Sequence, residues 1–150
     1  MAELTELTAW CDGLLASLES SQRRQLARQI ARELRTANVK RIAAQVTPDG
    51  QAFEPRKVNP RFRKQGSIRR GLFSKLRTAR FLKTEASPDG ATIGFSGRVG
   101  QIARVHHYGL RDRVRPGGPE HQYAARPLLG VTDDDIERIK ALVLASLIRM

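Results

Sequence analysis

The fold is decided by one stretch, Gly97–Gly130, which reads GRVGQIARVHHYGLRDRVRPGGPEHQYAARPLLG. Its early segment, Ile102–Gly109, has the pattern of one or two helical turns that end at a C-terminal glycine. Its last segment, Ala125–Gly130, is predicted to be extended, because the residue before a proline is pushed out of the helical region. The stretch therefore joins a predicted hairpin before it to a predicted helix after it.

Two helices are predicted at the start of the chain. Apolar residues such as Leu4, Leu7 and Trp10 recur at steps of three and four, which predicts a short amphipathic helix over residues 3–18. A longer helix is predicted over residues 22–45, with an apolar stripe on one side. Its outer face carries the arginines Arg23, Arg24, Arg28, Arg32 and Arg35. Such a face suits either a solvated surface or contact with a phosphate backbone.

A basic loop follows the turn Thr47–Gly50, whose proline, aspartate and glycine favour reversal of the chain. Residues 54–67 have too little apolar content to order themselves, so we predict a mobile arm that orders on a partner. The candidate contacts of this basic loop, either with a neighbour or with DNA in a channel, are Arg56, Lys57, Arg61, Arg63, Lys64, Arg69 and Arg70. A brief helix is predicted around Leu72, Phe73 and Leu76.

The clearest local signals lie in the second half of the chain. The turn Ser87–Gly90 separates two β-prone runs, which predicts a hairpin over residues 80–95. Thr132 and the three aspartates after it form a helix cap and an acidic first turn, so a helix is predicted over residues 133–148. The sequence thus predicts one α+β domain with N-terminal helices, a basic loop, a small antiparallel sheet and a capped C-terminal helix.

The composition narrows the class of partner. Lys and Arg number 27 against 15 Asp and Glu, a net charge of +12, which favours a polyanion or an acidic protein surface as partner. The single cysteine, Cys11, cannot form an internal disulfide and fits a reducing compartment. The acidic start does not resemble a secretory signal, and no run approaches the ~20 apolar residues of a membrane span. We therefore expect a soluble protein made in a cytoplasm.

The sequence shows no pattern typical of catalysis. His106 and His107 are adjacent, so they point in different directions on a helix, and a zinc site with His121 would need further ligands. Serine-nucleophile and phosphate-loop motifs are missing. Aromatic residues make up only 5% of the chain, too few for base stacking, so any contact with nucleic acid would involve the backbone alone. We predict no enzymatic activity, no cofactor and no metal.

Several spaced motifs together resemble the phage virion morphogenesis family. They are Arg41–Ala43 before Pro48–Gly50, the basic loop, the hairpin between Phe81 and Phe95, Ile102–His106 ending in Tyr108–Gly109, and Ala125–Gly130 before an acidic-capped helix. The resemblance covers nearly the whole chain and is nearest to the proteins that complete the tails of contractile-tailed, P2-like bacteriophages. Phe53 departs from the pattern, since a tryptophan is expected at this position.

The resemblance implies a structural role in the virion. Proteins of this kind are similar in role to tail terminators and neck proteins, which form rings, commonly of six copies, on the head-proximal end of the tail tube and let the tail join the DNA-filled head. The implied partners are other copies of the chain, the tail tube, and neck or connector proteins, with nonspecific DNA contact in the channel and no membrane. Two alternatives stay open: a head-side neck connector or adaptor, and a sequence-nonspecific basic nucleic-acid-binding protein.

The candidate assembly interface consists of Arg104, His106, Tyr108 and Arg126, which come from the two motifs that best match the family. Arginine and tyrosine anchor interfaces because they combine a large contact area with a polar tip. The alternative for Tyr108 is a core position beside Leu128. An interface position for Arg126 predicts that Arg126→Ala leaves the monomer folded and lowers the yield of joined particles.

Overall fold

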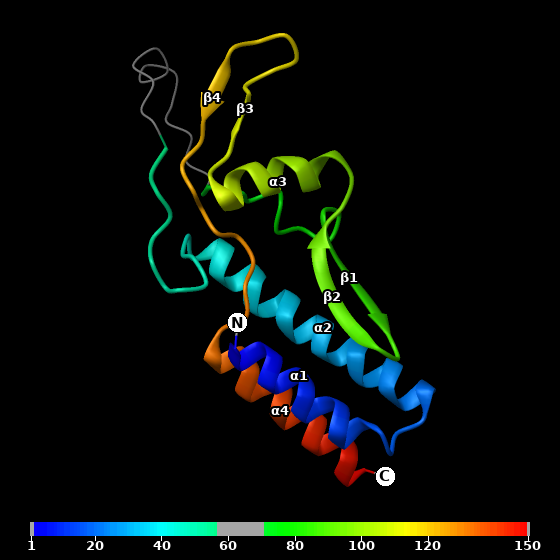
Figure 1. Ribbon diagram of the computed structural model, residues 1–150. Helices are drawn as coiled ribbons and strands as arrows, with labels where there is room; N and C mark the ends of the chain where they lie inside the picture. The colour runs from blue at the N-terminus through cyan, green and yellow to red at the C-terminus, as the bar shows by residue number, and fades with distance from the viewer. Residues whose placement is uncertain (1, 57–70, 150) are drawn as a thin grey trace. The chain divides into compact units, whose positions relative to one another are not determined.

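The computed structural model of the protein describes residues 2–56 and 71–149 (Figure 1). Four helices and two antiparallel two-stranded sheets occupy these ranges, which confirms the predicted α+β class. They divide into two compact units: unit 1 holds residues 1–37, 82–94 and 131–150, and unit 2 holds residues 38–81 and 95–130. No helix in the described ranges combines the length and the apolar content needed to cross a membrane.

Unit 1 is built from helices and one hairpin. Its elements are α1 (Ala2–Leu15), the larger part of α2 (Ser20–Ala43), β1 (Leu82–Ser87), all but the last residue of β2 (Gly90–Phe95), and α4 (Asp133–Ile148). Helices α1 and α4 lie side by side and run in the same direction (Figure 1). Their apolar faces and that of α2 meet in a core of Leu7, Leu18, Leu26, Ile136, Ile139 and Val143. The predicted helices and hairpin are thus confirmed to within a few residues.

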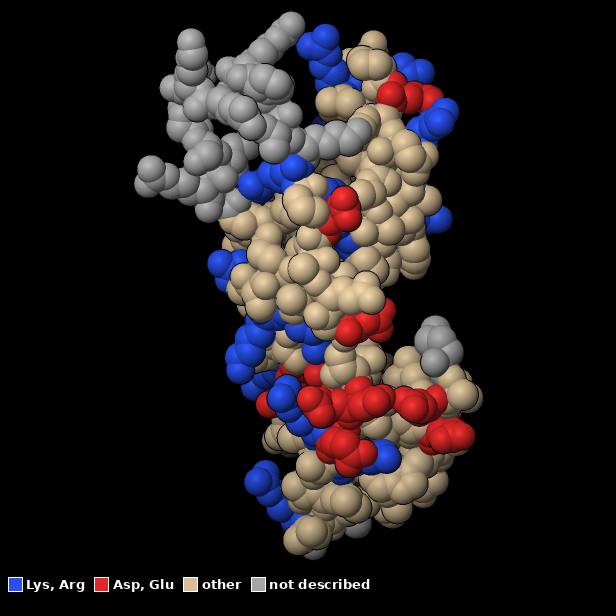
Figure 2. All heavy atoms as spheres, turned by 90° about the vertical axis from the view of Figure 1, so that its left-hand side faces the viewer, with Lys and Arg blue, Asp and Glu red and all other residues tan. Residues whose placement is uncertain are grey.

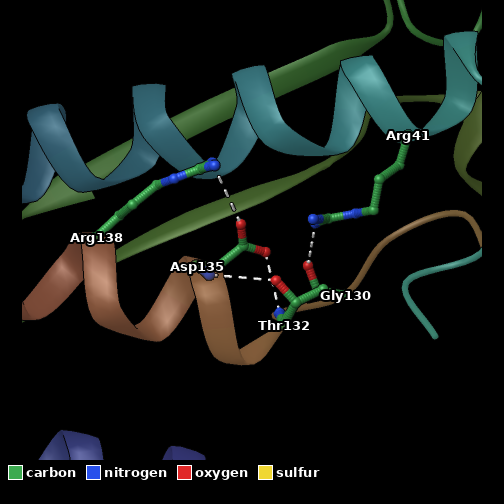
Figure 3. A network of polar contacts seen from close by, with 5 residues as sticks. All are labelled: Arg41, Gly130, Thr132, Asp135 and Arg138. Carbon is green, nitrogen blue, oxygen red and sulfur yellow. Dashed lines mark hydrogen bonds and ion pairs between the residues drawn. The ribbon is translucent and has the colours of Figure 1, made fainter. Parts of the chain in front are cut away.

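The start of α4 has the cap that its sequence predicts. The Thr132 hydroxyl accepts a hydrogen bond from the Asp135 N–H at 3.2 Å, and the Asp135 carboxylate accepts one from the Thr132 N–H at 3.0 Å (Figure 3). Each side chain therefore satisfies a backbone donor that the first helical turn leaves unpaired. The buried Asp135 also lies 3.9 Å from the guanidinium of Arg138, one turn further along the helix.

Unit 2 has a smaller core. Its elements are the end of α2 from Asn38 on, α3 (Arg98–Tyr108), β3 (Arg111–Arg113) and β4 (Glu120–Gln122). Phe53, Ala103 and Leu128 are buried together at its centre. The ring of Phe53 meets the ring of Phe73 edge to face, with 5.7 Å between centroids. Phenylalanine therefore fills, as a core residue, the position where the family resemblance implies tryptophan.

Helix α3 is longer than the one or two turns predicted. It begins at Arg98, four residues earlier than expected, and ends as predicted at Gly109, which adopts a left-handed conformation with φ 66° and donates its N–H to the Val105 carbonyl. A Cβ atom at position 109 would lie 2.7 Å from the backbone nitrogen of Ala125. Glycine is thus required here by both conformation and space.

The brief helix predicted around Leu72, Phe73 and Leu76 is absent, and residues 72–77 form a series of turns. Phe73 has a positive φ of 62°, which no right-handed helix accommodates. The Gln45 side chain accepts from the Leu72 N–H at 2.6 Å and donates to the Leu72 carbonyl at 2.9 Å. These long-range contacts, together with the packing of the Phe73 ring, override the local helical preference.

Candidate assembly surface

The extended segment Ala125–Gly130 is hydrogen-bonded to the end of α3. The Arg126 N–H donates to the His106 carbonyl at 2.7 Å. The Leu128 N–H donates to Nδ1 of His107 at 3.0 Å. Because alternate residues point the same way along an extended chain, both donors face the helix. The prediction of an extended, non-helical segment is confirmed, and hydrogen bonds from its backbone hold it against the end of α3.

Gly130 is held at the other end of this segment. Its N–H donates to Oδ1 of Asn38 at 3.0 Å, and its carbonyl accepts from the Arg41 guanidinium at 2.9 Å (Figure 3). A Cβ atom at this position would lie only 2.6 Å from the ring of Pro48. The two motifs Arg41–Ala43 and Pro48–Gly50 are therefore connected in space to the segment 125–130, as parts of one packed arrangement.

The Arg126 side chain has internal partners. It is only 8% exposed, and it donates from Nε to the Glu54 carbonyl at 2.7 Å and from Nη2 to the Pro55 carbonyl at 3.0 Å. A buried guanidinium needs such acceptors because it cannot lose its charge. The prediction from sequence put Arg126 on an assembly surface. The structure places its side chain inside unit 2, bound to the start of the basic loop, and a role of this residue in assembly stays a prediction.

The two histidines at the end of α3 are half-buried. The ring of His106 meets the rings of Phe73 and Tyr123 edge to face, with 5.1 and 4.8 Å between centroids. Burial, and to a lesser extent the charge of Arg126, lowers the pKa of His106, and burial lowers the pKa of His107. Both side chains therefore favour the neutral form. Within the ranges that the structure describes, no three His, Cys, Asp or Glu side chains group so as to hold a metal ion.

Two of the candidate interface residues lie on the surface of α3. Arg104 is exposed, and Tyr108, one turn further, is 65% exposed while its ring contacts that of His107 at 4.6 Å. Val105, in contrast, is buried in the core. Ile102 is a further exposed apolar residue on this helix. Of the four candidates, Arg104 and Tyr108 are thus placed where a neighbouring molecule can reach them, and their role in assembly stays a proposal.

A second hairpin, which the sequence patterns did not predict, follows α3. Strands β3 and β4 pair antiparallel through Arg111 with Gln122, and Arg113 with Glu120 (Figure 1). With three residues each, these strands are too short to show an alternating pattern. The available signal is the turn chemistry of Arg115–Pro119, in which two glycines stand between two prolines. We call residues 111–122 the β-arm.

Charge is divided unevenly between the two units. Counted over its residues in the sequence, unit 1 has 9 Lys and Arg against 11 Asp and Glu, a net charge of −2. Unit 2 has 18 against 4, a net charge of +14, which restores the +12 of the whole chain. In Figure 2 the largest group of acidic side chains forms a band in the lower half of the face drawn, and smaller acidic patches stand above it. The positive charge of this protein is thus a property of unit 2.

The basic loop is described only at its two ends. Arg56 is exposed, and its guanidinium donates to the Gly71 carbonyl at 3.3 Å. The other candidate contacts, Lys57, Arg61, Arg63, Lys64, Arg69 and Arg70, lie outside the described residues. The prediction that this loop orders on a partner therefore stays a prediction.

Two comparisons with known proteins give matches that agree with each other. The phage virion morphogenesis family matches residues 2–148 of the chain. Tail completion protein S of Escherichia phage P2 is 41% identical over 138 residues, which cover 91% of this chain and 92% of that protein. No solved structure matches the chain significantly.

Proposed function

Since the chain belongs to the phage virion morphogenesis family, we propose that it completes the head-proximal end of a phage tail as an oligomeric ring and enables head–tail joining. The observation that carries this proposal is the end-to-end similarity to a tail completion protein, 41% identical with more than nine-tenths of each chain covered. Similarity over a short fragment alone would support only a shared fold. Similarity over both compact units supports transfer of the role as well.

In this proposal the protein acts through contacts with its neighbours, in the neck region of the virion, and carries out no chemical reaction. The exposed side chains of α3, Arg104 and Tyr108, supply groups of the kind that anchor protein interfaces. The β-arm adds a second exposed element with backbone edges open to partners. Both features lie in unit 2.

The charge of unit 2 supports a nonspecific contact with the DNA that passes through a ring. A net charge of +14 attracts phosphate without reading sequence. Such binding should weaken steeply with salt, because each neutralised phosphate of duplex DNA releases about 0.9 counterion. Binding of the purified protein to duplexes of unrelated sequence at increasing salt measures this property separately from assembly.

Deletion of the gene from its phage tests the proposed function. We expect DNA-filled heads and separate tails, the tails unjoined or of abnormal length, in electron micrographs of the lysate. Expression of the intact protein in the host should restore joined particles. Heads that lose their DNA, with normal tails, would instead assign the protein to the head side of the neck as a connector.

The mass of the purified protein, alone and on isolated tail tubes, tests the oligomeric part of the proposal. We expect a multiple of the 16.8 kDa chain on the tubes. A protein that binds DNA as a monomer or dimer, and whose deletion leaves both heads and tails normal, would favour the alternative role of a basic nucleic-acid-binding protein.

A further inference from the structure

Unit 1 contains a groove between α1 and α4 whose net charge is negative, opposite in sign to the net charge of the chain. Its volume is about 630 Å³. Leu7, Trp10 and Ile136 form an apolar base, and Leu7 and Ile136 are buried. The remaining lining residues are charged: Glu3, Glu6, Asp133, Glu137 and Lys140. Four carboxylates against one ammonium give the groove a net charge of −3.

Helix capping explains only part of this acidity. Glu3 and Asp133 lie in the first turns of α1 and α4, where carboxylates stabilise the positive ends of the helix dipoles. Glu6 and Glu137 lie further along their helices, where the dipole effect has faded. A hydrogen bond and charge repulsion from Asp133 raise the pKa of Glu3, so the two carboxyls crowd each other. A cation bound at this rim would relieve that repulsion.

The β-arm carries the complementary chemistry. Its tip presents Val114, which is 61% exposed, between the exposed residues Arg113 and Arg115. The tip has a defined conformation, because the Val114 N–H donates to the Pro119 carbonyl at 3.2 Å and the Gly118 N–H donates to the Arg115 carbonyl at 2.9 Å. A preformed tip loses little conformational freedom on binding.

We propose that the tip of the β-arm of one copy docks in the α1–α4 groove of the next copy. Val114 then covers the apolar base beside Trp10, and Arg113 and Arg115 pair with the acidic rim. A second copy of this chain is the occupant that charge complementarity favours, since one sequence carries both the −3 groove and the arginine-flanked tip. This inference rests on the proposed self-assembly and names the contact that would produce it.

The geometry of such a contact fits a ring. Arm and groove are different surfaces, so each copy offers one of each and the contact is head-to-tail, the type that closes into rings when the rotation between copies allows it. A hairpin tip in a groove buries less than the ~1,600 Å² of a standard interface. Single contacts should therefore be weak, and closure of the ring or attachment to the tail tube should stabilise them together.

Paired charge reversals test the proposal. The arm variant carries Arg113→Glu and Arg115→Glu, and the groove variant carries Glu6→Lys and Glu137→Lys, which leaves the helix-capping acids unchanged. Matched controls change the net charge equally at exposed sites elsewhere: Arg24→Glu with Arg28→Glu, and Glu33→Lys with Glu85→Lys. Circular dichroism checks that every variant folds. Sedimentation equilibrium at low salt, and binding to isolated tail tubes, measure assembly.

We expect each reversed variant alone to associate at least about 100-fold more weakly than the native protein, because like charges then face each other across the contact. The controls should assemble normally. An equimolar mixture of the arm and groove variants should assemble again, since acidic arms then meet basic grooves and basic arms meet acidic grooves. Restoration by mixing requires a contact between different copies through these two surfaces.

Three results would overturn the proposal, and they separate it from the proposed function. If the native protein assembles and either reversed variant assembles equally well, the arm–groove contact is wrong while the ring stands. If both folded variants fail alone and the mixture also fails, the two surfaces bind something other than each other, such as a basic segment of a different tail protein. If the native protein stays monomeric both in solution and on tail tubes, the ring itself is wrong.

Discussion

Arg126→Ala should destabilise the isolated protein, in contrast to the prediction from sequence that the monomer stays intact. The substitution removes the two hydrogen bonds that the guanidinium donates to the Glu54 and Pro55 carbonyls, at 2.7 and 3.0 Å. Hydrogen bonds from charged groups contribute about 1.5–3 kcal/mol each, and the two share one side chain, so we expect a total loss of about 2–4 kcal/mol.

Urea unfolding followed by circular dichroism measures this loss. With a slope of about 2 kcal/mol per molar urea, the midpoint should fall by about 1–2 M. Arg126→Lys is the matched variant: an ammonium keeps the charge but lacks the planar fork, so it should recover part of the stability. Arg104→Ala, at an exposed position, should change the free energy of unfolding by less than about 0.5 kcal/mol.

A second readout is independent of stability. The charge of Arg126 contributes to the lowered pKa of His106, so removal of that charge should raise this pKa, as followed by nuclear magnetic resonance titration. If Arg126→Ala has a urea midpoint close to that of the native protein and still lowers the yield of joined particles, the internal role of this side chain is refuted and the interface role is supported.

The other predictions concern pH and two local structures. Folding lowers the pKa values of His106 and His107 from 6.5, so the unfolded state binds more protons than the folded state. The free energy of unfolding should therefore be highest above about pH 6.5 and fall as the pH drops below it. Urea midpoints measured between pH 8 and 5 check this direction. Thr132→Ala should lower the free energy of unfolding by about 1 kcal/mol, because it removes half of the capping box. Thr132→Ser should keep most of this stabilisation, and thermal midpoints of the two variants measure the difference. Gly109→Ala should cost about 2 kcal/mol in urea unfolding, because a left-handed alanine is strained and its methyl group meets Ala125.

Local signals predicted the elements whose ends are defined by nearby residues. The hairpin over residues 82–95 follows from its Pro-Asp-Gly turn, α4 from Thr132 and the aspartates after it, and the end of α3 from Gly109. In each case the residues that determine the structure stand within a few positions of the element. In these elements the local sequence preference and the tertiary packing favour the same conformation.

Features determined by long-range contacts could not be predicted in this way. Phe73 takes a positive φ where its ring packs against Phe53 and His106, so the helical pattern of its neighbours gave the wrong structure. Arg126 can be buried because two carbonyls from residues about 70 positions earlier accept hydrogen bonds from its guanidinium, whereas arginines in general lie on the surface. Neither partner is visible in the local pattern that surrounds these residues.

The acidic groove illustrates a further limit, because it depends on two helices at opposite ends of the chain. From sequence alone, the aspartates after Thr132 are explained by the start of a helix, and Glu3 and Glu6 are unremarkable charges on another helix. Only the parallel packing of α1 on α4 brings Asp133 and Glu137 beside them. The groove therefore becomes recognisable as a site when the pairing of the helices is known.

The segment 125–130, which is one of the motifs that identify the family, differs from the surfaces that we propose for assembly. In the segment 125–130, Arg126, Leu128 and Gly130 all bind internal partners, so alanine substitutions there should act first through folding. A loss of joined particles from such variants would say little about interfaces. The exposed tip of the β-arm, and Glu6 and Glu137 on the rim of the groove between α1 and α4, can be changed without removing a core contact or a cap. Loss of assembly at unchanged stability, measured at these two sites, is therefore the result that distinguishes a contact between subunits from a defect within one.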